Sequence, residues 1–309
     1  MLHFLVSRLL SAVFVVFGVM CVVFFLVHLV PGDPVEMMLG ESAQAADREA
    51  LRHALGLDQP LLTQLWHFVS NLMTLNLGDS LYYRRPIIDI LAERLPPTVQ
   101  LASSSLLVAV VIALPLGAIA AIRKDTIWDQ TAMGFSLLGL SIPNFWLGPI
   151  MIMIFSLWLG WFPVSGREGF GSLILPAVTL GLALSSILAR MVRSTLLEVL
   201  NEDYIRTARA KGLNESAVVW RHGLRNAMLP VITLLGLQLG TLLGGAVITE
   251  TVFSWPGVGS LMVEAIQRRD YPVVQVCILL ISLSYVMVNI FTDIVYAWVD
   301  PRIRLGDDG

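Results

Sequence analysis

The sequence is poor in charge and in cysteine. Only 14% of its 309 residues are charged and 56% are hydrophobic, whereas an average soluble domain carries about 25% charged residues. This composition excludes an ordinary soluble globular protein and predicts an integral membrane protein. The two cysteines, Cys21 and Cys277, lie in different apolar segments. They give no reason to expect a disulfide framework or a metal site, so we expect both to be small packing residues.

The signature motifs of several enzyme classes are also missing. The sequence has no GxxxxGK[ST] phosphate-binding loop, so we do not expect this chain to bind ATP by that route. The HExxH motif of zinc peptidases and the GxSxG motif of serine hydrolases are absent. No pair of carboxylates lies deep in an apolar stretch. We therefore expect no catalytic residue, no metal site and no bound cofactor on this chain, and nothing indicates a nucleic-acid partner.

Long apolar segments make up most of the chain. A bilayer span takes about 20 apolar residues. Six stretches without Asp, Glu, Lys or Arg reach this length: 9–32, 95–122, 130–166, 169–189, 226–249 and 271–292. We interpret 130–166 as one helix that ends near Leu159, followed by an interfacial segment. The expected fold class is all-α, an integral membrane protein with six transmembrane helices.

The distribution of Lys and Arg predicts the orientation, because short cytoplasmic loops carry an excess of both. If both termini are cytoplasmic, 12 of the 20 Lys and Arg residues lie inside. The short external loops then hold only Arg167, Arg268 and Arg269. The predicted organisation is an N-terminal transmembrane helix at 1–30, a periplasmic segment at 31–94, a membrane domain at 95–297 and a cytoplasmic tail at 298–309.

Residues 198–230 form a basic cytoplasmic segment that is predicted to contain two short helices around a turn. Asn201 is expected to cap the first helix and Asn214 the second, because Asn side chains accept hydrogen bonds from free helical N–H groups. Gly212 lies where a left-handed backbone conformation is expected, and Leu213 is expected to pack back onto the helix.

An apolar stripe of small residues follows one side of the first of these helices. Four residues fall within about a third of the helix circumference: Tyr204, Ile205, Ala208 and Gly212. Such a stripe suits close docking into a groove on another protein. The alternative is a solvated loop that only links two spans, because basic cytoplasmic loops are common in membrane proteins. The residues alone leave both interpretations open.

The fifth apolar stretch carries three glycines at four-residue spacing: Gly236, Gly240 and Gly244. In lipid this spacing lets helix backbones approach closely, so it predicts a helix-packing face.

A turn followed by an interfacial helix is predicted just after this stretch, from four residues: Trp255, Pro256, Gly257 and Gly259. We expect this external segment either to receive another protein or to plug the gap between spans.

Several sequence motifs in order resemble one family of transport proteins. They are PGDP at 31–34, DYIRTARAKG at 203–212, HGLRNAMLP at 222–230, ITETVFSWPGVGSLMVEAIQRRDYPVVQ at 248–275 and DPRIR at 300–304. Together they resemble the first of the two permease subunits of ABC importers in the dipeptide, oligopeptide and nickel group. The 203–212 stretch resembles the EAA-type coupling loop of these permeases. It has Arg206 in place of the Glu and Thr207 in place of the first Ala, as is usual in the peptide group, and it matches at Ala208 and Gly212.

This resemblance implies a type I ABC importer permease in the inner membrane, surrounded by lipid. It implies pairing with a second homologous permease, and two cytoplasmic ATPases that carry ATP and Mg²⁺ and dock on 202–217. A periplasmic binding protein would deliver the substrate, most often a di- or oligopeptide, with glutathione or nickel in some relatives.

A nickel importer permease remains an alternative, and so does an ion-coupled secondary transporter. The latter should show inverted repeats with broken spans, which the sequence does not clearly show.

Overall fold

The computed structural model describes residues 2–29, 35, 44–54 and 56–299, and in this part of the chain the regular structure is helical without a β-strand. The predicted all-α class is therefore confirmed. PGDP at 31–34 and the expected tail from residue 300 onward lie outside the described residues. The chain divides into two compact units, Met1–Pro96 with Gly257–Val286, and Pro97–Pro256 with Met287–Gly309.

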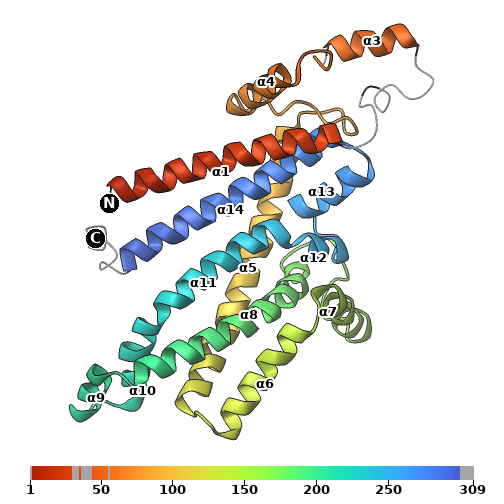
Figure 1. Cartoon of the computed structure of the whole chain (residues 1–309). Helices are drawn as coiled ribbons and strands as arrows, with labels where there is room; N and C mark the ends of the chain where they lie inside the picture. Colours follow the sequence, from red (N-terminus) through yellow and green to blue (C-terminus); the bar gives the residue numbers. More distant parts are fainter. Residues whose placement is uncertain (1, 30–34, 36–43, 55, 300–309) are drawn as a thin grey trace. The chain divides into compact units, whose positions relative to one another are not determined.

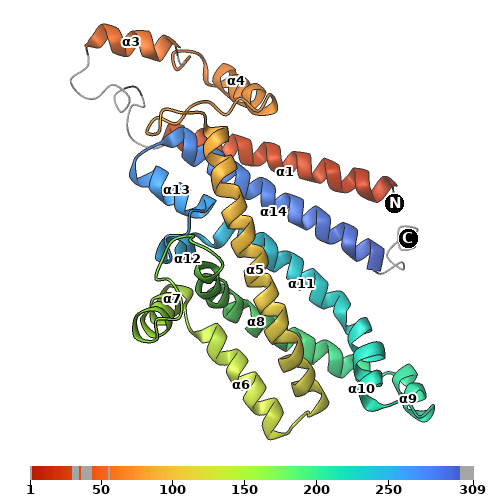
Figure 2. The same cartoon turned by 180° about the vertical axis from the view of Figure 1, so that it is seen from behind.

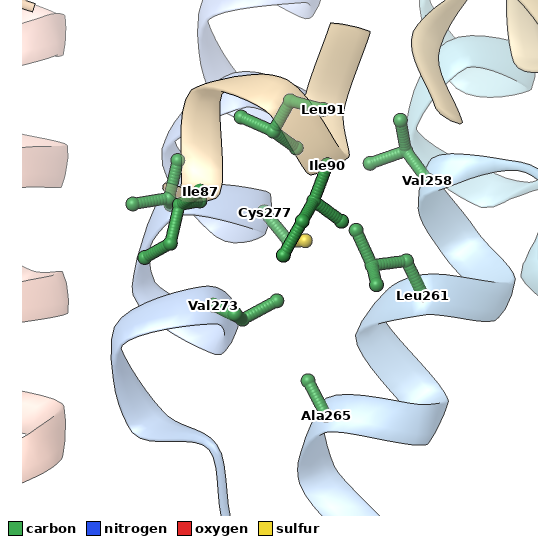
Figure 3. Packing of buried hydrophobic residues seen from close by; sticks show 9 residues of the cluster. Ile87, Ile90, Leu91, Val258, Leu261, Ala265, Val273 and Cys277 are labelled. Carbon is green, nitrogen blue, oxygen red and sulfur yellow. The ribbon is translucent and has the colours of Figure 1, made fainter. Parts of the chain in front are cut away.

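The first unit combines the N-terminal third of the chain with a later segment (Figure 1). Its helices are α1 (Leu2–Leu29), α3 (Ala45–Ala54), α4 (Leu61–Met73), the start of α5 (Ile87–Ile122), α13 (Val258–Gln267) and the first part of α14 (Tyr271–Val299). Its core, shown in Figure 3, is built from α5, α13 and α14 by nine buried residues: Ile87, Ile90, Leu91, Val258, Leu261, Ala265, Val273, Val276 and Cys277. Cys277 is therefore a packing residue, as expected.

A buried carboxylate clamps the loop before α5 to the start of α14. The side chain of Asp270 accepts hydrogen bonds from the Ser80 hydroxyl (2.5 Å) and from the backbone N–H groups of Leu81 (3.2 Å) and Tyr82 (3.1 Å). Ser80 and Asp270 are both buried. Three donors converge on this one carboxylate, so we expect it to contribute strongly to the loop conformation, together with the loop's own backbone hydrogen bonds.

Asp270→Ala is expected to loosen the loop around residues 79–86. The substitution leaves a buried hydroxyl and two N–H groups without their acceptor, at about 1–3 kcal/mol for each buried group left unsatisfied. Hydrogen exchange of the peptide that covers this loop should become faster. Asp270→Asn, which keeps one acceptor oxygen, should give a smaller increase. Equal exchange in Asp270→Ala and the wild type would show that the clamp does not hold the loop.

The second unit contains most of the long apolar helices, which Figure 2 shows from behind. They are the rest of α5, α6 (Ile127–Ser141), α7 (Asn144–Met151) with the π-helical segment η1 (Ile152–Trp158), α8 (Gly171–Leu200), α9 (Asp203–Ala210), α10 (Glu215–Ala217), the π-helical η2 (Val218–Gly223), α11 (Leu224–Gly245), α12 (Val247–Val252) and the end of α14.

The third predicted span is not one helix, and that interpretation was wrong. It is broken after Ser141, and the two halves, α6 and α7–η1, bend by 99°. Ile142 is extended (φ −90°, ψ 115°) because the following Pro143 disfavours the α conformation in the residue before it. The second half ends at Trp158, next to the predicted end at Leu159.

Glycines let α5 and α8 approach each other closely. A Cβ at Gly117 of α5 would lie 2.7 Å from the Ala189 carbonyl oxygen, and one at Gly181 of α8 would lie 2.9 Å from that of Ser105. Backbone contact of this kind is how helices associate in lipid. The helices α5 and α8 are therefore tightly packed against each other at these two glycines.

Within the described residues, four helical segments are long and apolar enough to cross a membrane: Ile87–Ile122, Gly171–Leu200, Glu215–Leu243 and Tyr271–Thr292. The bent pair α6 and α7–η1 makes a fifth if it counts as one span. The helix α1 covers the first predicted span, and its segment Leu10–Phe25 is apolar. A multi-pass membrane protein is therefore confirmed, whereas the count of six spans stays a prediction.

Candidate functional site

The segment 198–230 lies between two membrane helices and folds as a compact unit. Figure 1 shows α9 and α10 where α8 ends and α11 begins. The predicted arrangement of two short helices around a turn is therefore present, and η2 continues the second helix into α11.

The helix ends of this segment agree with the sequence prediction at one of two positions. Asn214 begins α10, and its side-chain oxygen accepts a hydrogen bond from the N–H of Ser216 at 2.8 Å. Asn201 does not cap α9, because Glu202 occupies the N-cap position. Instead Asn201 ends α8 and donates its side-chain N–H to the Leu197 carbonyl at 2.9 Å. An Asn between two helices can end the first helix or cap the second. The residue type alone therefore does not predict which of the two it does.

Gly212 has φ +75°, the left-handed conformation that the sequence predicted. A Cβ built on Gly212 meets no atom within 4 Å, so within this chain it is the backbone angle, and not a lack of space, that favours glycine here. The Gly212 N–H donates to the Arg209 carbonyl at 2.9 Å, which closes the turn. Leu213 is 42% exposed, so its side chain is partly covered, and its N–H donates to the Ala208 carbonyl at 3.4 Å.

The apolar stripe of α9 is largely covered by the chain itself. Ile205 is 0% and Ala208 7% exposed, and both pack with Val218 of η2 and Leu200 of α8. The expectation that these two side chains form an open docking face was therefore wrong. The helical projection identified residues that share a face, but the following helix folds back onto that face.

The surface that remains open includes Tyr204 at the edge of the stripe, Arg206 on the opposite side of α9, and the tip of the turn. We call this surface the outer face of the loop, and it consists of exposed residues: Tyr204, Arg206, Lys211, Gly212, Leu213 and Asn214. Arg206 pairs with Asp203 at 3.3 Å. The outer face therefore combines apolar, small and basic residues.

Two polar contacts brace the loop. The Arg209 guanidinium donates to both carboxylate oxygens of Glu215, at 2.7 and 3.1 Å, and so joins α9 to α10 across the turn. The hydrogen bond to Glu215 raises the pKa of Arg209 further above its ordinary value, so this guanidinium stays charged. The Asn226 side chain of α11 donates to the Tyr204 hydroxyl at 2.8 Å. These two contacts connect α9 to α10 and α9 to α11 next to the outer face.

The loop is also anchored to the membrane helices through a second apolar cluster. This cluster joins α5, α8, η2 and α11 through five buried residues: Ala118, Ala121, Leu196, Val219 and Ala227. Gly223 lies close against α8, since a Cβ there would be 3.0 Å from Leu196 Cδ1. The loop is therefore packed directly against α8 and α11.

A buried ion pair, which sequence reasoning missed, connects α6 to α8. Arg193 donates two hydrogen bonds to Asp129, at 2.6 and 2.7 Å, and Asp129 also accepts from the Asp125 N–H at 3.0 Å. The geometry is bidentate, which is the strong form of the Arg–carboxylate contact. The isolated charge of Asp129 beside an apolar stretch was the signal that could have pointed to a partner.

One residue of the predicted glycine face of α11, Gly236, makes close contact within this chain. A Cβ at Gly236 would lie 2.0 Å from Thr292 Oγ1 of α14, far inside contact distance. Gly240 is buried. Gly244 lies in the last turn of α11, but its surroundings fall outside the described residues.

The turn at residues 255–257 is present and precedes the helix α13. Trp255 is buried, and its indole N–H donates to the Pro97 carbonyl at 2.9 Å. Pro256 is partly exposed, and Gly257 precedes α13, donating its N–H to the Ser260 hydroxyl at 3.1 Å. Because the Trp255 ring packs among Leu101, Leu173 and other core residues, it does not belong to an outer docking surface. Among the residues searched, no group of three or more His, Cys, Asp or Glu could hold a metal ion.

Comparison with known sequences gives consistent matches along the chain. Residues 113–305 match the family described as "binding-protein-dependent transport system inner membrane component", and residues 1–102 match the N-terminal region of such components. The glutathione transport system permease protein GsiC of Escherichia coli K12 is 45% identical over 304 residues, which covers 98% of this chain and 99% of that protein. GsiC of Shigella boydii serotype 4 is 44% identical over the same length.

Solved structures share the fold at low sequence identity. The inward-facing MetNI methionine ABC transporter superposes with a TM-score of 0.58 at 21% identity, over 69% of this chain and 97% of that one. An amino acid ABC transporter crystallised with histidines gives a TM-score of 0.52 at 12% identity, over 70% and 94% of the two chains.

Proposed function

Because the chain belongs to the family of binding-protein-dependent transport system inner membrane components, we propose that the outer face of its 203–217 loop is the surface on which cytoplasmic ATPases dock. The chain is a permease of an ABC importer, a multi-pass protein of the inner membrane with the type I importer fold. The observation that carries the proposal is the loop itself, which is braced internally, anchored on α8 and α11, and exposed at its tip.

The family implies that this permease works with an ATPase and a binding protein. The finer composition belongs to our proposal: a second homologous permease completes the path, two ATPases bind ATP and Mg²⁺, and a periplasmic binding protein delivers the substrate. In this arrangement the chain itself is non-catalytic. Hydrolysis on the ATPases would move the loop, and the anchor on α8 and α11 would pass that motion into the membrane.

We propose a topology with both termini cytoplasmic and six spans. The segments are a first helix at 1–30, a periplasmic segment at 31–94, a membrane domain at 95–297 and a tail at 298–309. The supporting observation is the charge distribution, because 12 of the 20 Lys and Arg residues lie inside in this topology.

The proposed substrates are glutathione and other short peptides. The support comes from the relatives that carry glutathione transport in their names and align with this chain over nearly its whole length. They do not favour the nickel alternative. An ion-coupled secondary transporter is not supported, because the broken span at Ile142 occurs in a chain of the importer family.

Uptake of labelled glutathione tests this function. Proteoliposomes that contain the complete importer, with ATP and the binding protein supplied, should accumulate glutathione, and dipeptides should compete whereas Ni²⁺ should not. The control is the same complex with an ATPase that binds ATP but cannot hydrolyse it. Uptake driven by an ion gradient without ATP, or uptake of Ni²⁺ in place of glutathione, would contradict the proposal.

A further inference from the structure

The helix α4 in the first unit has two adjacent apolar faces. The first is formed by Leu61, Leu65, Phe68 and Leu72, and the second by Leu62, Trp66, Val69 and Met73. Each set follows the i, i+4, i+7, i+11 spacing that lines one face of an α-helix. The remaining side chains are polar: Thr63, Gln64, His67, Ser70 and Asn71. The helix contains no Asp, Glu, Lys or Arg.

The first of these faces lies against the protein at Leu65, Phe68 and Leu72, which are partly buried, whereas Leu61 at its start is 51% exposed. Phe68 contacts Phe24 of α1, with ring centroids 5.8 Å apart. On the second face, Leu62 is 79%, Trp66 71% and Met73 73% exposed. An exposed apolar face next to one that already packs against the protein indicates that a second partner covers the exposed face.

The neighbour α1 identifies that partner. The helix α1 is a long apolar helix of a membrane protein, and Val22 and Phe25, next to the contact residue Phe24, are 60% and 43% exposed. In a membrane these exposed side chains meet lipid. Because α4 packs on this stretch of α1, its own exposed face continues the same lipid-facing surface.

The length and composition of α4 determine how it meets the bilayer. Its 13 residues span about 20 Å at 1.5 Å per residue, which is too short to cross a hydrocarbon core of about 30 Å. Tryptophan prefers the membrane–water interface, and an amphipathic helix lies in the plane of that interface with its apolar face toward the acyl chains.

We propose that α4 is an interfacial helix that inserts the face formed by Leu62, Trp66, Val69 and Met73 into the lipid surface beside α1. The polar side chains on the other side of α4 remain in water. Because the helix has no charged side chain, this insertion depends on apolar contact and not on anionic headgroups.

Spin labels on the complete chain in lipid nanodiscs test the proposal. Met73→Cys places a label on the proposed lipid face, and Asn71→Cys, two residues away, places the matched control on the polar face. Both are made in a background with Cys21→Ala and Cys277→Ala that retains transport. We expect the ratio of oxygen to nickel-chelate accessibility to be severalfold higher at 73 than at 71. This ratio should be the same in phosphatidylcholine alone and in mixtures with phosphatidylglycerol.

A second measurement avoids the cysteine background. In nanodiscs that contain brominated lipids, the wild-type protein should lose more fluorescence than Trp66→Phe, because Trp66 lies within reach of the acyl chains. Three results would overturn the proposal: higher nickel-chelate accessibility at 73 than at 71, shielding of 73 from both reagents by a protein partner, or a lipid contact that appears only with anionic lipid.

Discussion

Replacing Gly212 by valine is expected to stop transport while the protein remains in the membrane. Gly212 has φ +75°. A residue with a Cβ is less stable in this conformation by roughly 1–2 kcal/mol. The equilibrium between the native turn and other conformations then shifts away from the native turn by a factor of about 5–30. The valine side chain also adds bulk at the tip of the outer face. Glutathione uptake and substrate-stimulated ATP hydrolysis should fall together, with normal abundance in the membrane.

Two further variants separate docking from folding of the loop. Gly212→Asn tolerates the left-handed conformation better, so it should retain more uptake than Gly212→Val. Ala208→Glu places a charge in the buried cluster with Ile205 and Val218, so it should unfold the loop and increase its proteolysis. If Gly212→Val supported normal uptake, a larger side chain at the tip would not disturb docking of the ATPase. The loop would then be only a linker.

Gly236→Ala is expected to destabilise the membrane domain. The added Cβ would lie 2.0 Å from Oγ1 and 2.6 Å from Cγ2 of Thr292, so α11 and α14 must separate or shift. Overpacking of this kind costs about 1–3 kcal/mol. The purified complex should lose its structure at a lower temperature than the wild type, and its uptake should decrease.

A second glycine within a helix, where a Cβ would meet no neighbouring atom, provides the control. A Cβ at Gly134 of α6 meets no atom within 4 Å, so Gly134→Ala should be neutral or slightly stabilising, because alanine favours a helix over glycine by about 1 kcal/mol. Thr292→Gly, which removes the clashing side chain, should restore part of the stability of Gly236→Ala. Equal melting temperatures for Gly236→Ala and Gly134→Ala would show that the helices are not in close contact there.

The sequence predicted the helical membrane fold because long uncharged stretches have few other solutions in lipid. It did not predict the break at Ile142 and Pro143. The chain also places Pro149, Pro176 and Pro230 inside helices. The presence of a proline in an apolar stretch therefore does not by itself predict whether the helix continues or breaks. The outcome also depends on how the neighbouring helices pack.

Local signals predicted the turn of the loop but not its surroundings. The left-handed Gly212 and the cap at Asn214 depend on residues close in sequence, so pattern was sufficient. The burial of Ile205 and Ala208 depends on η2 folding back, and the ion pair joins Asp129 to Arg193, 64 residues apart. Contacts of this separation cannot be inferred from spacing along one chain.

Cross-linking from the tip of the loop tests the docking surface most directly. A photoreactive benzoylphenylalanine in place of the exposed Leu213 should form an adduct with an ATPase subunit in the assembled importer. The same group in place of the exposed Leu75, in the segment that is proposed to be periplasmic, should not. An ATPase adduct at 213 alone is the predicted result. A complex that transports glutathione and hydrolyses ATP, but gives no ATPase adduct from position 213, would contradict the account.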